Sequence, residues 1–178
     1  MYENQNLTAN NSRREKIIIK TSILGIITNV FLAIFKAIIG YITNSIAVIL
    51  DAINNISDAL SSVVTIAGAK LASKAPDKKH PMGYGRIEYL SSMIVAAIVL
   101  YAGITSLVES MKKIIHPQEA EYSIISIVII AVAVVVKFIL GKYVKRQGEK
   151  VDSGALIASG ADSIFDSILS LSVFISAI

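Results

Sequence analysis

Four polar residues interrupt two strongly apolar stretches of this chain. Asn54 and Asp58 lie in one stretch and Asp162 and Asp166 in another, and the members of each pair are four residues apart. On a helix this spacing places both side chains of a pair on one face. Carboxylates at membrane depth are costly and usually belong to an ion pathway. Since these side chains offer only oxygen, they suit a hard divalent cation, and we predict a metal site.

Such a site needs two helices, because neither pair can surround a cation alone. We therefore expect the two stretches to meet near Asp58 and Asp162. Three carboxylates and one amide fit the oxygen coordination of Mn²⁺, Mg²⁺ or Ca²⁺. Zinc usually takes His or Cys ligands. The chain has no Cys, and its two histidines, His80 and His116, lie outside the apolar stretches.

The elements that must position these residues are membrane-spanning helices. Of the 178 residues 54% are hydrophobic and only 17% are charged, which is typical of a membrane protein. Five apolar segments are each long enough to cross a bilayer as a helix. The sequence thus predicts an all-α membrane protein, a transmembrane helical bundle over 16–178 that follows a polar N-terminal tail at 1–15. The expected spans are 16–41, 45–71, 87–115, 122–143 and 153–178, with Pro117 ending the third.

The distribution of basic residues predicts the orientation. Thirteen of the seventeen lie in the N-terminal flank and in the second and fourth connections. By the positive-inside rule these parts are cytoplasmic, as is the N-terminus. We expect the plasma membrane of a prokaryote as the location. The thirteen are Arg13, Arg14, Lys16, Lys20, Lys70, Lys74, Lys78, Lys79, Arg86, Lys142, Lys145, Arg146 and Lys150.

Other polar residues in the apolar segments have a structural interpretation. Lys36 and Lys137 lie towards one end of their segments, so we expect their ammonium groups to snorkel to the membrane surface or to serve packing. Pairing of these lysines with Asp162 and Asp166 is the alternative. A second group should hold helices together through hydrogen bonds between them. This group comprises Asn55, Ser57, Ser61 and Ser62.

The chain resembles the cation diffusion facilitator family of divalent metal/proton antiporters. The resemblance rests on NSIAVILDAINNISDALSS at 44–62, HPMGYGRIE at 80–88 and ASGADSIFDS at 158–167. It implies a homodimer in which six transmembrane helices precede a small cytoplasmic metal-binding domain. Because this sequence ends at Ile178 with the fifth span, we expect it to be a fragment or a truncated member.

The resemblance also implies the site. It carries the family's transport ligands to Asn54, Asp58, Asp162 and Asp166, and this pattern is similar to that of the manganese-exporting branch. Zinc-handling members have His or Asp at the first and third positions. Asp51 matches an acidic position one turn earlier and is expected beside the ligands or at the entry.

The loop motif implies a second metal site in some members. Asp77 and His80 match two of its positions, but Tyr84 stands where a third ligand is expected. We therefore interpret His80 as a residue that structures the loop.

We thus expect a transporter and not an enzyme. The predicted activity is Mn²⁺ efflux in exchange for protons, since protons compete with metal for buried carboxylates. Its partners would be the metal ion, protons, the bilayer and a second copy of the protein, with no cofactor and no nucleic acid. Export of Zn²⁺, Fe²⁺ or Co²⁺ is one alternative. A non-transporting scaffold, metal sensor or metal-binding fragment is another, and an intramembrane aspartyl protease, which needs one Asp on each of two facing helices, is the third.

Overall fold

The computed structural model describes residues 2–42, 46–74, 76–78, 80–115 and 124–176. These residues form five long helices, and no strand occurs among them, which confirms the expected all-α bundle. The predicted stop at Pro117, like His116, lies outside the described residues. The helices are α1 (Tyr2–Ile42), α2 (Ile46–Ala72), α3 (Ile87–Ile115), α4 (Ile124–Lys150) and α5 (Gly154–Ser176).

Two helices extend beyond the predicted spans. α1 already begins at Tyr2, and α4 continues to Lys150, past its expected end near Tyr143. Neither extension contains proline, and the α4 extension is rich in Lys, Arg, Gln and Glu, which favour helix. The length of an apolar stretch therefore predicts the membrane-spanning part of a helix. It does not predict where the helix ends, because the helix continues into the polar region.

The outside of the bundle is apolar. Within the described part of the chain, three stretches are long and apolar enough to cross a membrane by length and composition: Ser12–Ile42, Ile87–Thr105 and Gly154–Leu171. Large apolar side chains such as Phe31 and Leu100 are more than half exposed. Soluble proteins rarely expose so many large apolar side chains. Such exposure is typical of a surface that faces lipid.

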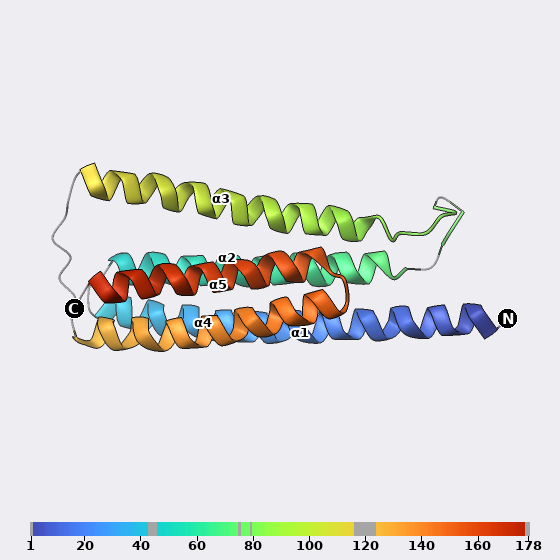
Figure 1. Cartoon of the computed structure of the whole chain (residues 1–178), viewed down its shortest axis with the longest axis horizontal. Coiled ribbons are helices and arrows are strands. Elements are labelled where there is room, and N and C mark those ends of the chain that lie inside the picture. Colours follow the sequence, from blue (N-terminus) through green and yellow to red (C-terminus); the bar gives the residue numbers. More distant parts are fainter. Residues whose placement is uncertain (1, 43–45, 75, 79, 116–123, 177–178) are drawn as a thin grey trace.

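The bundle consists of two antiparallel hairpins and one outer helix (Figure 1). α1 packs against α2, and α4 packs against α5, while α3 lies alongside α2 and α5. A Cβ atom added to Gly160 would collide with the backbone nitrogen of Lys145, and one added to Gly141 would lie 2.9 Å from the nitrogen of Ile164. The backbones of α4 and α5 therefore approach closely at these glycines, as small residues allow in membrane helices.

A short turn joins α4 to α5. Asp152 has a φ of 51°, the left-handed conformation that often ends a helix and that Asp and Asn tolerate. The nitrogen of Ser153 donates to the carbonyl of Gly148, and the carbonyl of Ser153 accepts from Ile157 in the first turn of α5. The turn reverses the chain within three residues, which sets α5 antiparallel to α4.

Arg14 on α1 joins the start of α3 and the α4–α5 turn at one end of the bundle. Its guanidinium donates to both carboxylate oxygens of Glu88 at the start of α3, at 2.6 and 2.7 Å. It also donates to the carbonyls of Val151 at 2.5 Å and Asp152 at 2.8 Å. The N-terminal part of α1, the α2–α3 loop and the α4–α5 turn therefore share one end of the bundle (Figure 1), as the distribution of basic residues requires.

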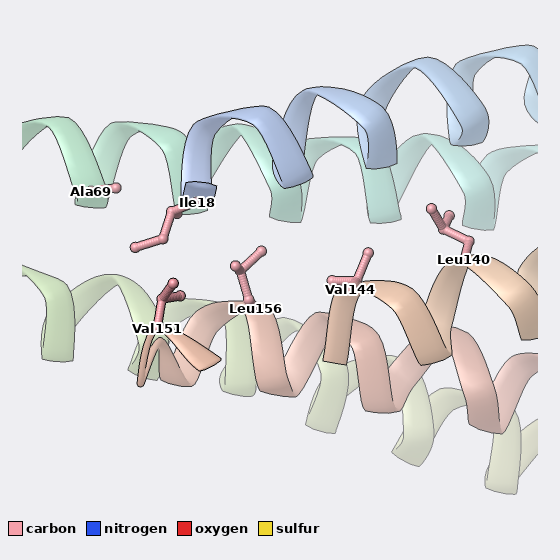
Figure 2. Packing of buried hydrophobic residues seen from close by; sticks show 6 residues of the cluster. All are labelled: Ile18, Ala69, Leu140, Val144, Val151 and Leu156. Carbon is pink, nitrogen blue, oxygen red and sulfur yellow. The ribbon is translucent and has the colours of Figure 1, made fainter. Parts of the chain in front are cut away.

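An apolar cluster packs near this end. Side chains from α1, α2, α4, the α4–α5 turn and α5 converge between the helices (Figure 2). The cluster comprises Ile18, Ala69, Leu140, Val144, Val151 and Leu156. It joins the two hairpins and so fixes α2 and α5, which carry the four predicted ligands, relative to each other.

Candidate metal centre

Three of the four predicted ligands meet between α2 and α5. Oxygens of Asp58, Asp162 and Asp166, one from each carboxylate, all lie within 4.8 Å of one another. Two oxygens bound to one cation at about 2.0–2.6 Å lie at most roughly twice that distance apart. The three carboxylates are therefore close enough to share a single ion. All three are partly buried, as a site within a bundle requires.

Asp58 lies in a part of α2 that is rich in Ala and Ser. Small residues surround it, and their hydroxyls bond to their own helix: Ser62 Oγ donates to the Asp58 carbonyl and Ser61 Oγ to that of Ser57. The prediction that these serines join helices was wrong, because a hydroxyl in a helix reaches the carbonyl four residues earlier. Asn55 is fully buried, and its side-chain atoms have no hydrogen-bond partner among the described residues.

Asn54 lies one helical turn before Asp58 on the same face of α2. Its side chain is exposed, whereas Asp58 is only 12% exposed. Its role as a metal ligand therefore remains a prediction.

A lysine also takes part in the cluster. Lys137 on α4 donates to Asp58 Oδ2 at 2.8 Å and to Asp166 Oδ2 at 2.5 Å. Its side chain is only 4% exposed. The prediction that Lys137 snorkels to the surface was therefore wrong, and the alternative, pairing of this lysine with Asp166, holds. Two nearby carboxylates stabilise the ammonium group more than water would if the side chain extended to the membrane surface.

A second buried lysine pairs with Asp51. Lys36 Nζ on α1 lies 2.6 Å from Asp51 Oδ2 on α2, and the lysine side chain is 3% exposed. Snorkelling was thus the wrong prediction here too. Asp51 is held by α1 and is a helix-pairing residue in this structure, while its predicted place at the entry to the site remains untested.

Asp77 organises the loop that contains the second motif, HPMGYGRIE at 80–88. Its Oδ1 accepts from the backbone nitrogen of His80 at 2.8 Å, and its Oδ2 accepts from the hydroxyl of Tyr84 at 2.6 Å. The ring centroids of His80 and Tyr84 lie 4.4 Å apart. The hydrogen bond from the Tyr84 hydroxyl to Asp77 raises the pKa of the Tyr84 phenol, because it favours the protonated form, and the nearby negative charge adds to the effect. Both oxygens of Asp77 thus hold the loop in shape.

The sequence contained a signal for the lysine contacts. A lysine inside an apolar run that also contains buried aspartates is expected to pair with one, since each charge offsets the desolvation cost of the other. The helical periodicity does not reveal which aspartate it meets. That choice depends on the packing of α4 against α5 and α2.

Comparisons with known proteins agree with these observations. Residues 22–178 match the family model described as the cation efflux transmembrane domain. An uncharacterised transporter of Methanocaldococcus jannaschii is 33% identical over 88% of this chain and 55% of its own length. The manganese efflux system proteins MneS and MneP of Bacillus subtilis are 31% and 32% identical over 88% and 94% of the chain, and over 54% and 56% of their own lengths.

The chain thus spans about half the length of the curated relatives that it matches. The match to the family model extends over all the described helices from Ser22 onward and includes the carboxylate cluster. With its multi-pass helical bundle, the chain is an integral membrane protein of the cation efflux, or cation diffusion facilitator, family.

Proposed function

We propose that this chain forms the membrane pathway of a divalent-cation efflux carrier that prefers Mn²⁺. The observation that supports this proposal is the cluster of Asp58, Asp162 and Asp166, whose oxygens lie within 4.8 Å of one another on two helices. Carboxylates placed so closely repel one another unless cations lie among them. A cluster of this kind binds and moves ions without covalent chemistry, so we propose a carrier and not an enzyme.

The preference for Mn²⁺ rests on the donor atoms. The proposed ligands Asn54, Asp58, Asp162 and Asp166 offer only oxygen, and the chain has no Cys. Two relatives are named as manganese efflux proteins. Zn²⁺, Fe²⁺ and Co²⁺ are the competing substrates, because later metals bind most permissive sites more tightly.

We further propose that protons move in exchange for metal. Without a metal ion, the three carboxylates lie close together in a partly buried site, where water solvates their charge poorly. Bound protons neutralise this charge, so protons compete with the metal for the same oxygens. Since Asn54 does not titrate, proton exchange falls to Asp58, Asp162 and Asp166. We place the N-terminus in the cytoplasm at the plasma membrane, and we expect the full-length protein to work as a homodimer.

The test is ion flux in proteoliposomes of the full-length protein. An imposed pH gradient is expected to drive Mn²⁺ against its own gradient, with counterflow of protons detected by a pH-sensitive dye. Asp162→Asn is expected to reduce Mn²⁺ flux by about a hundredfold, since it removes one of the three charged ligands. Asp152→Asn is the matched control, because it makes the same change in the α4–α5 turn and Asn tolerates the left-handed backbone there.

Three outcomes would contradict the proposal in different ways. Equal flux in Asp162→Asn and the wild type would mean that the cluster is not the pathway. Mn²⁺ flux that ignores the pH gradient would leave a passive uniporter. Zn²⁺ flux equal to or faster than Mn²⁺ flux would overturn the selectivity while leaving the carrier in place.

A further inference from the structure

The carboxylate cluster already contains one cation. Lys137 reaches it from α4, a third helix, and its Nζ bridges Oδ2 of Asp58 on α2 and Oδ2 of Asp166 on α5, at 2.8 and 2.5 Å. Its side chain is 4% exposed, so the ammonium group has little access to water in place of these oxygens. The lysine therefore joins the two helices that supply the proposed metal ligands.

The position of this ammonium group conflicts with that of a metal ion. A cation shared by Asp58 and Asp166 must lie about 2.0–2.6 Å from oxygens of both residues. Nζ occupies the space between two of those oxygens at nearly that distance. Two cations that bind the same oxygens lie within a few ångströms of each other, where their repulsion in a partly buried site is strong. The ammonium group and the metal therefore compete for the same place.

We propose that Lys137 is a tethered cation that occupies the metal position in the empty carrier, and that an entering divalent cation displaces its ammonium group from Asp58 and Asp166. This inference rests on the proposed function. Asp162, the third carboxylate of the cluster, offers the entering ion its first oxygen. The flexible stem of four methylenes lets the ammonium group move away while α4 stays packed on α5.

Such a tethered cation has two consequences for transport. It compensates part of the charge of the empty cluster, so the carboxylates stay close together without a metal. It also weakens metal binding, because a group held on the same molecule has a high effective concentration at the site. Weaker binding favours release of the metal on the far side, which a carrier needs as much as capture.

A purely structural role for Lys137 predicts the opposite result. If the lysine only positions the ligands, its removal disorders them and metal binding weakens. If it competes with the metal, its removal makes metal binding tighter. The sign of the change in Mn²⁺ affinity therefore separates the two roles.

The experiment is Mn²⁺ binding to the full-length protein in lipid nanodiscs at one fixed pH. Free Mn²⁺ is measured by its electron paramagnetic resonance signal, which is lost when the ion binds. Lys137→Met keeps the length of the stem and removes the charge, and it is expected to bind Mn²⁺ at least about tenfold more tightly than the wild type. Lys142→Met is the matched control on α4, because the Lys142 ammonium lies over the ring of Phe138, 4.5 Å from its centroid. Its affinity should be that of the wild type.

A second variant, Lys137→Arg, tests the same inference if Lys137→Met does not fold. A guanidinium group keeps the charge and binds carboxylates in a fork, so it should be harder to displace and should weaken Mn²⁺ binding about tenfold or more. Lys137→Met with unchanged or weaker affinity would overturn the inference, as would Lys137→Arg that binds at least as tightly as the wild type. Absence of Mn²⁺ binding in folded wild type and in every folded variant would instead overturn the proposed function.

Discussion

Lys36 on α1 and Asp51 on α2 form an ion pair of 2.6 Å between Nζ and Oδ2. The lysine is almost completely buried, while the carboxylate is partly exposed at the side of α2. Because a single cation and a single anion meet there, this pair differs from the Lys137 cluster, in which one cation meets several carboxylates. We infer that it stabilises the α1–α2 hairpin and does not take part in metal binding.

Lys36→Met should therefore destabilise the bundle without changing Mn²⁺ affinity. Loss of one partner leaves the other charge poorly compensated, with an expected cost of about 1–3 kcal/mol. Thermal unfolding in detergent measures the effect. The double variant Lys36→Met/Asp51→Leu should recover part of the loss, because no unpaired charge remains. A single variant as stable as the wild type would contradict the role of this pair.

Gly160→Ala should separate α4 from α5. The added methyl group would collide with the backbone of Lys145, which cannot rotate away as a side chain would. We expect a loss of about 1–3 kcal/mol in unfolding free energy and weaker Mn²⁺ binding, since Asp162 lies half a turn further along α5. Gly103→Ala on α3 is the control, because a Cβ there meets no atom within 4 Å. Equal stability of the two variants would mean that the backbones do not approach so closely.

Asn54→His should shift the preference from Mn²⁺ towards Zn²⁺. An imidazole at this position adds a nitrogen ligand beside the three carboxylates, and zinc favours nitrogen over amide oxygen. Competition between the two ions, measured as flux in proteoliposomes, should move towards Zn²⁺ by about tenfold or more. Asn55→His one residue away is the matched control, because Asn55 is buried on another face of α2. A similar shift in both variants would show that the effect does not arise at the cluster.

Asp77→Ala should lower the pKa of Tyr84 towards that of an ordinary phenol. The hydrogen bond to the carboxylate favours the protonated phenol, so the contact persists at neutral pH and is lost as the pH rises through the raised pKa of Tyr84. Tyrosinate absorbance as a function of pH, with Tyr84→Phe subtracted, isolates this titration from those of the other tyrosines. An identical curve in Asp77→Ala and the wild type would contradict the hydrogen bond.

Single cysteines should reveal the side of the membrane. The chain has no native Cys, so Ser73→Cys after α2 and Tyr41→Cys at the far end of α1 each give one thiol. An impermeant thiol reagent on intact cells should label position 41 and leave position 73 unlabelled until the cells are opened. The reverse pattern would place the end of the bundle that contains Arg14 outside the cell.

The sequence alone determined the helices and the candidate ligands. Helical spacing put Asn54 with Asp58 and Asp162 with Asp166, because i and i+4 share a face whatever surrounds the helix. The apolar runs located the helices, since a bilayer demands apolar side chains and internal backbone hydrogen bonds. Helix ends were less well predicted. The residues at 2–15 and 144–150, most of them polar, are helical in the structure, but such residues occur equally in helices and in loops.

Only the tertiary structure decided which charges meet. Lys36 and Lys137 are alike in sequence, each a lone lysine in an apolar run, yet one pairs with a single aspartate of α2 and the other bridges aspartates of two helices. This difference depends on how α4 packs on α5 and how α1 packs on α2. Such contacts join residues 15, 29 and 79 positions apart, and no local periodicity encodes them. Long-range packing thus determines how the charges inside the bundle are compensated.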